Sequence, residues 1–182
     1  MLFHVSEESG IERFEPRASE YASGLVVWAI DARRLCNYLL PRECPRVTYY
    51  AGAETSAPDV ERFLGSSPAV VAVENGWLER LCSCRLYCYH VPPATFACLD
   101  ECAGYFVSNV AVVPSGVEIV DDPIAELLRR GVELRFLPNL WPLRDAVVQS
   151  SLQFSLIRMR NATPRVAPRV GAHDIGITPT GT

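Results

Sequence analysis

Glycine and proline divide this chain into many short apolar segments, and no long regular helix or strand fits between them. The 182 residues include 14 prolines and 11 glycines. Strand-like runs lie at 2–6, 25–30, 46–51, 69–74, 85–91, 105–113, 117–120 and 133–136. The helical patterns are short, at 31–39, 58–64, 76–81, 123–131 and from 142 to about 154. A doubly wound parallel sheet needs regular crossover helices, which are missing. The pattern therefore predicts an α+β fold, with a bent or split, mostly antiparallel mixed sheet and short helices.

The length and composition predict one domain followed by a tail. A chain of 182 residues of which 49% are apolar can bury a single core. After Asn161 the sequence turns to proline, glycine and threonine and loses its apolar patterning. We therefore expect residues 1–161 to form one α+β domain and residues 162–182 to be a tail or a partner-bound extension.

Charge and hydropathy exclude several classes of partner. The net charge of -4 gives no general attraction for nucleic acid. No apolar run is long enough for a transmembrane helix, and the N-terminus lacks the basic region of a secretory signal. We therefore expect a cytoplasmic protein with reduced cysteines. All 17 basic residues are arginine, so an anion site must use guanidinium or backbone N–H groups.

The segment LCSCRLYCYH looks like a metal site because it contains Cys82, Cys84, Cys88 and His90. Read as a strand, it places all four on one face together with Leu86, where neighbours lie about 6.6 Å apart. Zinc binds sulfur at about 2.3 Å, which a rigid strand does not provide from adjacent positions. The spacing therefore predicts buried thiols, and we expect no metal.

The remaining cysteines are interpreted in the same way, as small buried side chains. They are Cys36, Cys44, Cys98 and Cys102. Cys44 has an alternative, because Arg42 and Arg46 flank it in PRECPR. Cationic neighbours lower a thiol pKa, so a nucleophilic Cys44 is the second interpretation.

His4 is the histidine that best fits an acid or base. In a strand over LFHVS, His4 and Ser6 point to one side, and Phe3 and Val5 point to the other. We expect Phe3 and Val5 to face the core, so that His4 and Ser6 line a cleft or face solvent. A surface histidine or a hydrogen-bonded structural histidine is the alternative.

The arginines of PRECPR start a candidate anion pocket. Arg42 and Arg46 adjoin the predicted strand 46–51. Together with Arg135, Arg158 and Arg160 they form a candidate site for phosphate or carboxylate. Separate surface ion pairs are the alternative interpretation.

The last predicted helix carries a second candidate group. Helical spacing places Trp141, Asp145 and Gln149 on one face. Asp145, Gln149 and the adjacent Ser150 are candidates to contact a substrate or the groups that do, and a solvated helix surface is the alternative.

Nearly the whole chain, residues 1–162, resembles a bacterial family of unknown function. The matching segments are LFHVSE, IERFEPR, LVVWAID, PRECPRVTYYA, GWLERL, AGYFVS, VELRFLPNLWPL and LQFSLIRMRNA. This resemblance implies no particular activity.

Three motifs also resemble ADP-ribosyltransferase-like domains of the His-Tyr-Glu type. They are FHVS with His4, LVVWAIDARRLCNYLL with Tyr38, and Glu101 before GYFVSNVAVVP. The resemblance implies that His4 holds a ribose hydroxyl of NAD and that Tyr38 stacks on nicotinamide. It also implies that Glu101 stabilises an oxocarbenium ion, with Tyr105 or Glu118 as alternatives.

Three functions remain open. The first is a small enzyme that binds NAD or another nucleotide or phosphorylated ligand, with His4, Tyr38 and Glu101 as catalytic residues. The second is an isomerase, lyase or hydrolase that uses His4 and the arginines. The third is a non-catalytic binding module, and a homodimer is an open alternative. The expected substrate-binding residues are Ser6, Arg42, Arg46, Tyr105, Trp141, Asp145 and Arg158.

Overall fold

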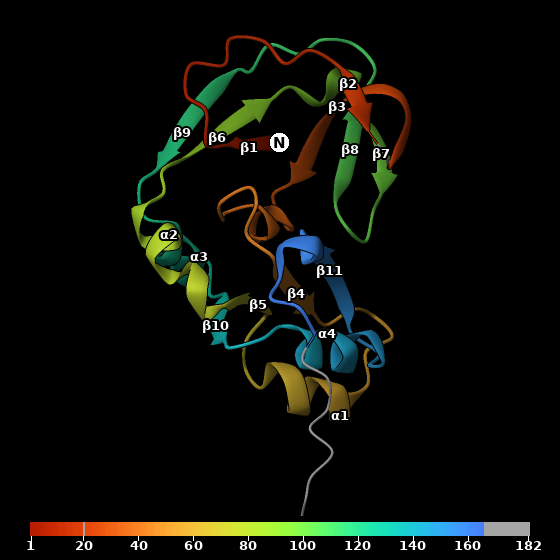
Figure 1. Cartoon of the computed structure of the whole chain (residues 1–182). Coiled ribbons are helices and arrows are strands. Elements are labelled where there is room, and N and C mark those ends of the chain that lie inside the picture. Colours follow the sequence, from red (N-terminus) through yellow and green to blue (C-terminus); the bar gives the residue numbers. More distant parts are fainter. Residues whose placement is uncertain (20, 166–182) are drawn as a thin grey trace, which may run out of the picture.

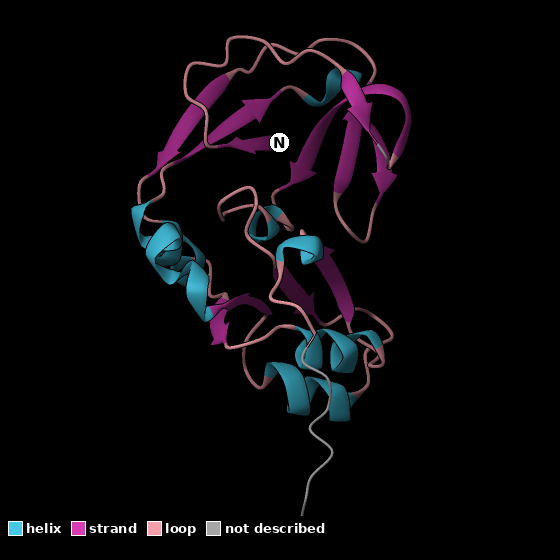
Figure 2. Cartoon of the chain, viewed as in Figure 1, coloured by secondary structure: helices cyan, strands magenta, loops and turns pink. Residues whose placement is uncertain are grey.

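The computed structural model describes residues 1–19 and 21–165, and the chain forms two β-sheets connected by short helices (Figures 1 and 2). The seven-stranded sheet has the order β7-β8-β3-β1-β6-β9, with β2 paired to β3. All of its pairings are antiparallel. Its strands are β1 (Leu2–Ser6), β2 (Arg17–Ser19), β3 (Ala22–Asp31), β6 (Leu86–Val91), β7 (Ala97–Asp100), β8 (Tyr105–Ser108) and β9 (Gly116–Val120).

The four-stranded sheet has the order β10-β5-β4-β11. Strands β10 and β5 are parallel, and the other two pairings are antiparallel. The strands are β4 (Arg46–Tyr50), β5 (Ala69–Glu74), β10 (Glu133–Leu137) and β11 (Gln153–Ile157). Because β4 is central, alternation divides its side chains: Val47 and Tyr49 face one way, and Arg46, Thr48 and Tyr50 face the other.

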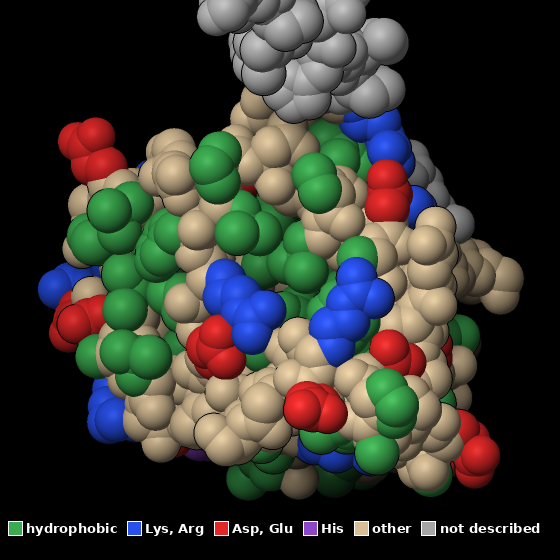
Figure 3. All heavy atoms as spheres, turned by 90° about the horizontal axis from the view of Figure 1, so that it is seen from below, with side chains coloured by type: hydrophobic (Ala, Val, Ile, Leu, Met, Phe, Trp, Pro, Cys, Tyr) green, Lys and Arg blue, Asp and Glu red, His purple; other side chains and the backbone are tan. Residues whose placement is uncertain are grey.

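The helices are short and lie beside the sheets. They are α1 (Ala57–Asp59), which continues as the π-helical η2 (Val60–Leu64), α2 (Leu78–Ser83), α3 (Pro123–Arg129) and α4 (Trp141–Val148). Single 3-10 turns form η1 (Leu35–Asn37), η3 (Asn75–Trp77), η4 (Pro93–Thr95) and η5 (Met159–Asn161). Helices α1 and α4 lie on the outer side of the four-stranded sheet. Figure 3 shows this end of the molecule, where hydrophobic side chains are interspersed with arginines and acids. No helix in the described part of the chain is long and apolar enough to cross a membrane.

Three apolar clusters hold these layers together. The main core lies between the two sheets, where Ile30 of β3 and Val71 of β5 pack with Leu81 of α2 and Leu127 of α3. A second cluster joins the four-stranded sheet to η2 and α4. The third lies on the outer face of the seven-stranded sheet, where Phe14 covers it. Burial of apolar area in these clusters is the main force that keeps such short elements in place.

The α+β class and the split, mostly antiparallel sheet are confirmed. Strands 2–6 and 69–74 have the predicted bounds, and the predicted alternation of β1 holds because Phe3 and Val5 pack against the main core. The division into a 1–161 domain and a tail stays a prediction, although residues 162–165 already pack against the domain. Residues 166–182 lie outside the described part.

The predicted helix from 142 to about 154 is wrong in its second half. Helix α4 ends at Val148, and β11 follows, so 133–136 is not the last strand. Ser150 Oγ donates to Val147 O at 2.7 Å, which satisfies a carbonyl at the helix end. The following residues then pair with β4. Local apolar spacing does not show whether this segment continues as a helix or forms a strand. The strand forms because it pairs with β4, which lies far away in the sequence.

Other differences have local causes. Only Leu35–Asn37 is helical within 31–39, because Asn37 O accepts from the Arg46 guanidinium at 2.8 Å. Strand β8 ends at Ser108, whose Oγ donates to Val110 O at 3.1 Å. The strands β2 and β7 were not predicted, since they are short and largely exposed.

Candidate functional site

A pocket with three arginines lies where the segment after β3 meets the start of β5 and the end of α3. Its volume is about 380 Å³, and its lining consists of Ala32, Arg33, Arg34, Cys36, Pro68, Ala69, Arg130 and Val132. We call it the arginine pocket. Guanidinium groups bind phosphate and carboxylate oxygens with paired, charge-assisted hydrogen bonds. The lining therefore favours an anionic ligand.

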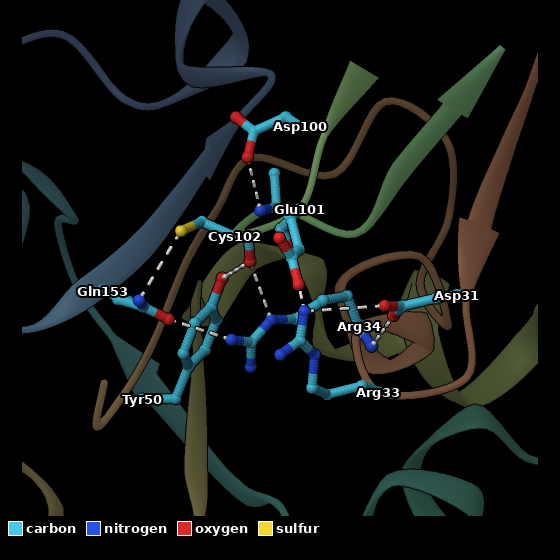
Figure 4. Close-up of polar contacts among 9 residues, drawn as sticks. Asp31, Arg33, Arg34, Tyr50, Asp100, Glu101, Cys102 and Gln153 are labelled. Carbon is cyan, nitrogen blue, oxygen red and sulfur yellow. Dashed lines mark hydrogen bonds and ion pairs between the residues drawn. The ribbon is translucent and has the colours of Figure 1, made fainter. Parts of the chain in front are cut away.

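Arg34 is one of the residues that line the arginine pocket, and it is 8% exposed. Its Nε donates to Cys102 O at 3.0 Å and its Nη2 to Gln153 Oε1 at 3.0 Å (Figure 4). Its Cζ lies 3.3 Å from the centroid of the Tyr50 ring. Among the described residues, no carboxylate oxygen lies within 4 Å of this guanidinium, and Nη1 has no hydrogen-bond partner. The guanidinium therefore has no anion beside it, and its contacts Tyr50, Cys102 and Gln153 are not among the residues that line the pocket.

Asp31, at the end of β3, and the loop that follows β7 together hold Arg34 in place. Asp31 Oδ1 accepts from the backbone N–H of Arg34 at 2.8 Å. Gly104 has φ +68°, and a Cβ there would lie 2.7 Å from Asp31 Oδ1 and 2.8 Å from Arg34 Cγ. Glycine is therefore required both for the left-handed backbone and for the close approach. Asp100 Oδ1 accepts from Ala103 N–H at 2.9 Å and stabilises the same turn (Figure 4).

The two other arginines of the pocket are exposed and already paired with acids. Arg33 lies 3.7 Å from Asp31 Oδ2, and its Nη2 donates to Glu101 O at 2.6 Å. Arg130 Nε lies 2.7 Å from Glu126 Oε1. Such exposed pairs are weak, so both side chains are free to turn toward a ligand.

Cys36 forms part of the pocket wall and is buried. Burial raises the pKa of its thiol, although Arg34 and Arg130 act in the opposite direction. The thiol is therefore protonated near neutral pH. Its contribution to the pocket is an apolar wall rather than a nucleophile.

The structure brings Tyr38, Arg46 and Tyr105 of the predicted site together between the sheets. The rings of Tyr38 and Tyr105 are 6.3 Å apart, and Arg46 Cζ lies 5.7 Å from the Tyr38 ring. The Tyr105 hydroxyl lies 3.5 Å from Ser155 Oγ. Burial, followed by the neighbouring Tyr105, raises the pKa of Tyr38 far above its ordinary value. The phenol therefore stays protonated.

Arg46 is bound by the loop that precedes its own strand. Its guanidinium donates to Asn37 O at 2.8 Å, Pro41 O at 3.1 Å and Cys44 O at 2.9 Å. These contacts make Arg46 a structural residue rather than an anion-binding one. Nearby, the Nδ2 of Asn37 and the Oγ1 of Thr48 are buried and have no hydrogen-bond partner.

His4 lies on the opposite face of β1 from the main core. Its Nδ1 donates to Trp28 O at 2.8 Å, and its ring packs 4.4 Å from the Phe14 ring. Burial lowers the pKa of His4 below 6.5, and the hydrogen bond to Trp28 only partly opposes this. The expected cleft or solvent-facing position is not found, because Phe14 covers the ring. The geometry fits the alternative of a hydrogen-bonded structural histidine.

The predicted triad is therefore not assembled at one place. Tyr38 packs against the main core, and strand alternation directs His4 away from it. Glu101 lies in the exposed turn between β7 and β8, where its carbonyl accepts hydrogen bonds from Arg33 and from the Gly104 N–H, and its carboxylate has no hydrogen-bond partner among the described residues. Ser6 Oγ, at the end of β1, accepts from Glu8 N–H at 3.0 Å.

The predicted anion pocket around Arg42 is not found either. Arg158 Nε donates to Arg42 O at 3.4 Å and pairs with Glu43 at 3.4 Å. Arg160 is 3.9 Å from the same carboxylate. Arg135 pairs with Glu133 at 2.6 Å and donates to the Tyr49 hydroxyl at 2.7 Å. Arg158 and Arg160 thus share the carboxylate of Glu43, and Arg135 forms an ion pair of its own, so acids of the chain already neutralise these arginines.

Trp141 and Asp145 share a helix face as predicted, and they contact the C-terminal segment. Trp141 Nε1 donates to Thr163 O at 2.8 Å. Asp145 pairs with Arg165 at 2.6 Å. Their role as substrate contacts stays a prediction.

The cysteine prediction holds for only part of the set. Cys36, Cys44, Cys84 and Cys88 are buried, whereas Cys82, Cys98 and Cys102 are exposed. The prediction that LCSCRLYCYH is a strand with its cysteines on one face is wrong for the first part of the segment. Cys82 belongs to α2, and β6 begins only at Leu86. Burial raises the pKa of Cys44 to about 12, so the nucleophilic alternative is not supported. Among the described residues, no three acids, histidines or cysteines are placed to hold a metal ion.

The sequence prediction missed the three arginines of the pocket. A signal was present, because Arg33-Arg34 and Arg129-Arg130 are two arginine doublets, each at the end of a predicted element. Nothing local connects them, since they meet only when β3 and α3 pack around the main core.

Comparisons with known proteins identify the family. The two-sheet α+β fold and its arginine pocket occupy the part of the chain that a family model covers. Residues 3–162 match the model described as "Family of unknown function (DUF6886)". The chain belongs to this family. No curated protein and no solved structure matches it.

Proposed function

We propose that this protein binds a small phosphorylated ligand, such as a nucleotide or NAD, in the arginine pocket. The observation that carries the proposal is Arg34, a pocket-lining residue that is 8% exposed and whose guanidinium has no carboxylate within 4 Å among the described residues. A buried charge with no counter-ion is unfavourable, and an anion in the pocket would offset that cost.

The donor arrangement fits a phosphoryl group better than a carboxylate. Arg34 has an unpartnered Nη1, and Arg33 and Arg130 are further lining residues with guanidinium donors. A phosphate monoester offers three acceptor oxygens that can use donors from several sides, whereas a carboxylate offers two in one plane. A volume of about 380 Å³ is within the range for small-ligand pockets.

The remaining wall suits an apolar or flat part of the same ligand. Cys36, Pro68, Ala69 and Val132 line it. None of these side chains is an acid or base at neutral pH, and His4 lies on the other side of the seven-stranded sheet. The proposal is therefore one of binding, and it is independent of whether a reaction follows.

Calorimetric titration with adenosine, AMP, ADP-ribose and NAD tests the proposal. Adenosine and AMP differ by the phosphate alone, so AMP should bind at least about tenfold more tightly, as charge-assisted hydrogen bonds contribute about 1.5–3 kcal/mol. Arg34→Gln should lower the affinity for AMP by a similar factor. Arg62→Gln, which removes an exposed arginine on η2, is the matched control and should leave the affinity unchanged.

Two results would contradict this assignment. One is equal binding of AMP and adenosine, or no binding of any phosphorylated ligand at millimolar concentration. The other is an equal affinity for AMP in Arg34→Gln and in Arg62→Gln, with thermal unfolding curves that show both variants folded.

A further inference from the structure

The segment Thr163–Arg165 follows the residues that match the family model, and it lies in extended contact with β5 and α4. Its first residue is bound by Glu74, which is 4% exposed at the end of β5. Thr163 N–H donates to Glu74 Oε2 at 2.9 Å, and Thr163 Oγ1 donates to the same oxygen at 2.9 Å. The buried carboxylate thus accepts both a backbone and a side-chain donor from one residue.

The carbonyls of the segment are bound as well. Trp141 Nε1 donates to Thr163 O at 2.8 Å, and Asn139 Nδ2 donates to Pro164 O at 3.3 Å. Side chains of the domain therefore contact the backbone of the segment at two successive carbonyls. This is the way in which binding sites for extended peptides obtain affinity without depending on sequence.

Arg165 supplies the sequence-specific contact. Its guanidinium makes two hydrogen bonds to the Asp145 carboxylate, at 2.6 and 3.0 Å. Its Cζ also lies 4.3 Å from the centroid of the Trp141 ring. A carboxylate and an indole one helical turn apart match the planar, forked arginine side chain, and lysine would satisfy only part of this arrangement.

We propose that Glu74, Asn139, Trp141 and Asp145 form a recognition site for an extended Thr-Pro-Arg segment. The chain's own segment fills the site in cis, and the same segment of another polypeptide can replace it. The anchors are polar; Glu74 is buried, but the outer pair is partly exposed, with 54% of the Arg165 side chain and 37% of the Asp145 side chain accessible. Contacts of this kind exchange readily, unlike a segment anchored by buried apolar side chains. The proposal does not depend on the arginine pocket.

The sequence itself supports a recognition motif. Pro-Arg-Val occurs at 164–166 and again at 168–170, where alanine stands in place of the preceding threonine. The second copy lacks the hydroxyl that Glu74 binds, so it should bind more weakly in a peptide of the same length.

A peptide titration followed by NMR of the Trp141 indole N–H tests the site in the full chain. Thr163→Ala combined with Arg165→Ala weakens the cis contact, and Trp141→Phe assigns the indole signal among the three tryptophans. Adding the peptide Ala-Thr-Pro-Arg-Val should move the signal saturably toward its wild-type position. The peptide Ala-Thr-Pro-Ala-Val should not, and Asp145→Asn in the same background should weaken peptide binding at least tenfold.

The indole signals of Trp28 and Trp77 report whether the variant is folded. With both signals unchanged, the absence of a saturable shift at 10 mM peptide, about the highest concentration at which specific weak binding is meaningful, would overturn the proposal. Equal shifts with the arginine and alanine peptides would also overturn it, because the site would then not read arginine. The wild-type chain should respond less to the peptide, since its own segment competes at a high effective concentration.

Discussion

Two buried arginines connect η1 with β4, and they differ in what surrounds them. Arg34 precedes η1 and lies over Tyr50 of β4, whereas Arg46 of β4 lies beside Tyr38, which follows η1. In both cases an arginine guanidinium lies over a tyrosine ring, but the arginine comes from the η1 side in one contact and from β4 in the other. Neither guanidinium has a carboxylate within 4 Å among the described residues.

The difference lies in their hydrogen-bond partners and in access. Arg46 donates to three backbone carbonyls and is 2% exposed. Arg34 donates to one carbonyl and one side-chain amide, and it lines the arginine pocket. Burial of a charge therefore does not identify a binding site by itself. A site is indicated when a charged residue of low exposure also lines a cavity and keeps a donor without a partner.

The largest effect is expected for Arg46→Leu. Three buried carbonyls lose their donors, and an unpaired buried acceptor costs about 1–3 kcal/mol. We expect the free energy of unfolding to fall by about 3–5 kcal/mol, as measured by urea denaturation. A loss of less than about 1 kcal/mol in the free energy of unfolding would contradict the structural role assigned to Arg46, and with it the difference from Arg34.

Arg34→Lys should separate binding from stability. Lysine keeps the positive charge but not the planar fork that bonds Cys102 O and Gln153 Oε1 together. We expect the affinity for AMP in calorimetry to fall about tenfold, while the free energy of unfolding falls by only about 1–2 kcal/mol. If stability fell as far as in Arg46→Leu with AMP affinity intact, the two roles would be reversed.

His4 extends the comparison to a partly buried basic group, whose pKa is lowered by its surroundings. Since its folded-state pKa is lowered from 6.5, the unfolded chain binds more protons, and stability falls as the pH drops below 6.5. His4→Gln should lose the Trp28 hydrogen bond but also lose this pH dependence. Denaturation curves of both proteins at pH 7.5 and 5 check this. If the free energy of unfolding fell equally between pH 7.5 and pH 5 in the wild type and in His4→Gln, the inferred titration of His4 would be wrong.

The smallest effect is expected for Thr48→Val, on the face of β4 between Arg46 and Tyr50. The Thr48 hydroxyl is buried without a partner, so a methyl group of similar shape removes an unfavourable burial. We expect the free energy of unfolding to stay unchanged or to rise by up to about 1 kcal/mol. A loss of more than about 1 kcal/mol would show that the hydroxyl is bonded in solution, which would sharpen the comparison by adding a polar partner between the arginines.

The arginine pocket was not predicted from the sequence, but part of the core and some neighbours of the predicted site were. The alternation of β1 placed Phe3 and Val5 in the core, and Tyr38, Arg46 and Tyr105 were singled out and do meet. Their role in binding stays a prediction. His4 was predicted to be accessible because strand alternation says which face a side chain takes, but not what covers that face. The cover is Phe14, held by its bridge to Val112.

The sequence by itself determined the α+β class, the short elements and the bounds of strands such as β1 and β5. Those features depend on local apolar spacing and on the positions of proline and glycine, which act within a few residues. Only the tertiary structure decided that Arg34 faces a pocket and that Arg46 does not. The partners that decide it for Arg34 are Cys102 and Gln153, which are 68 and 119 residues away in the chain. Contacts at such separations follow from how the two sheets pack, and no local pattern records them.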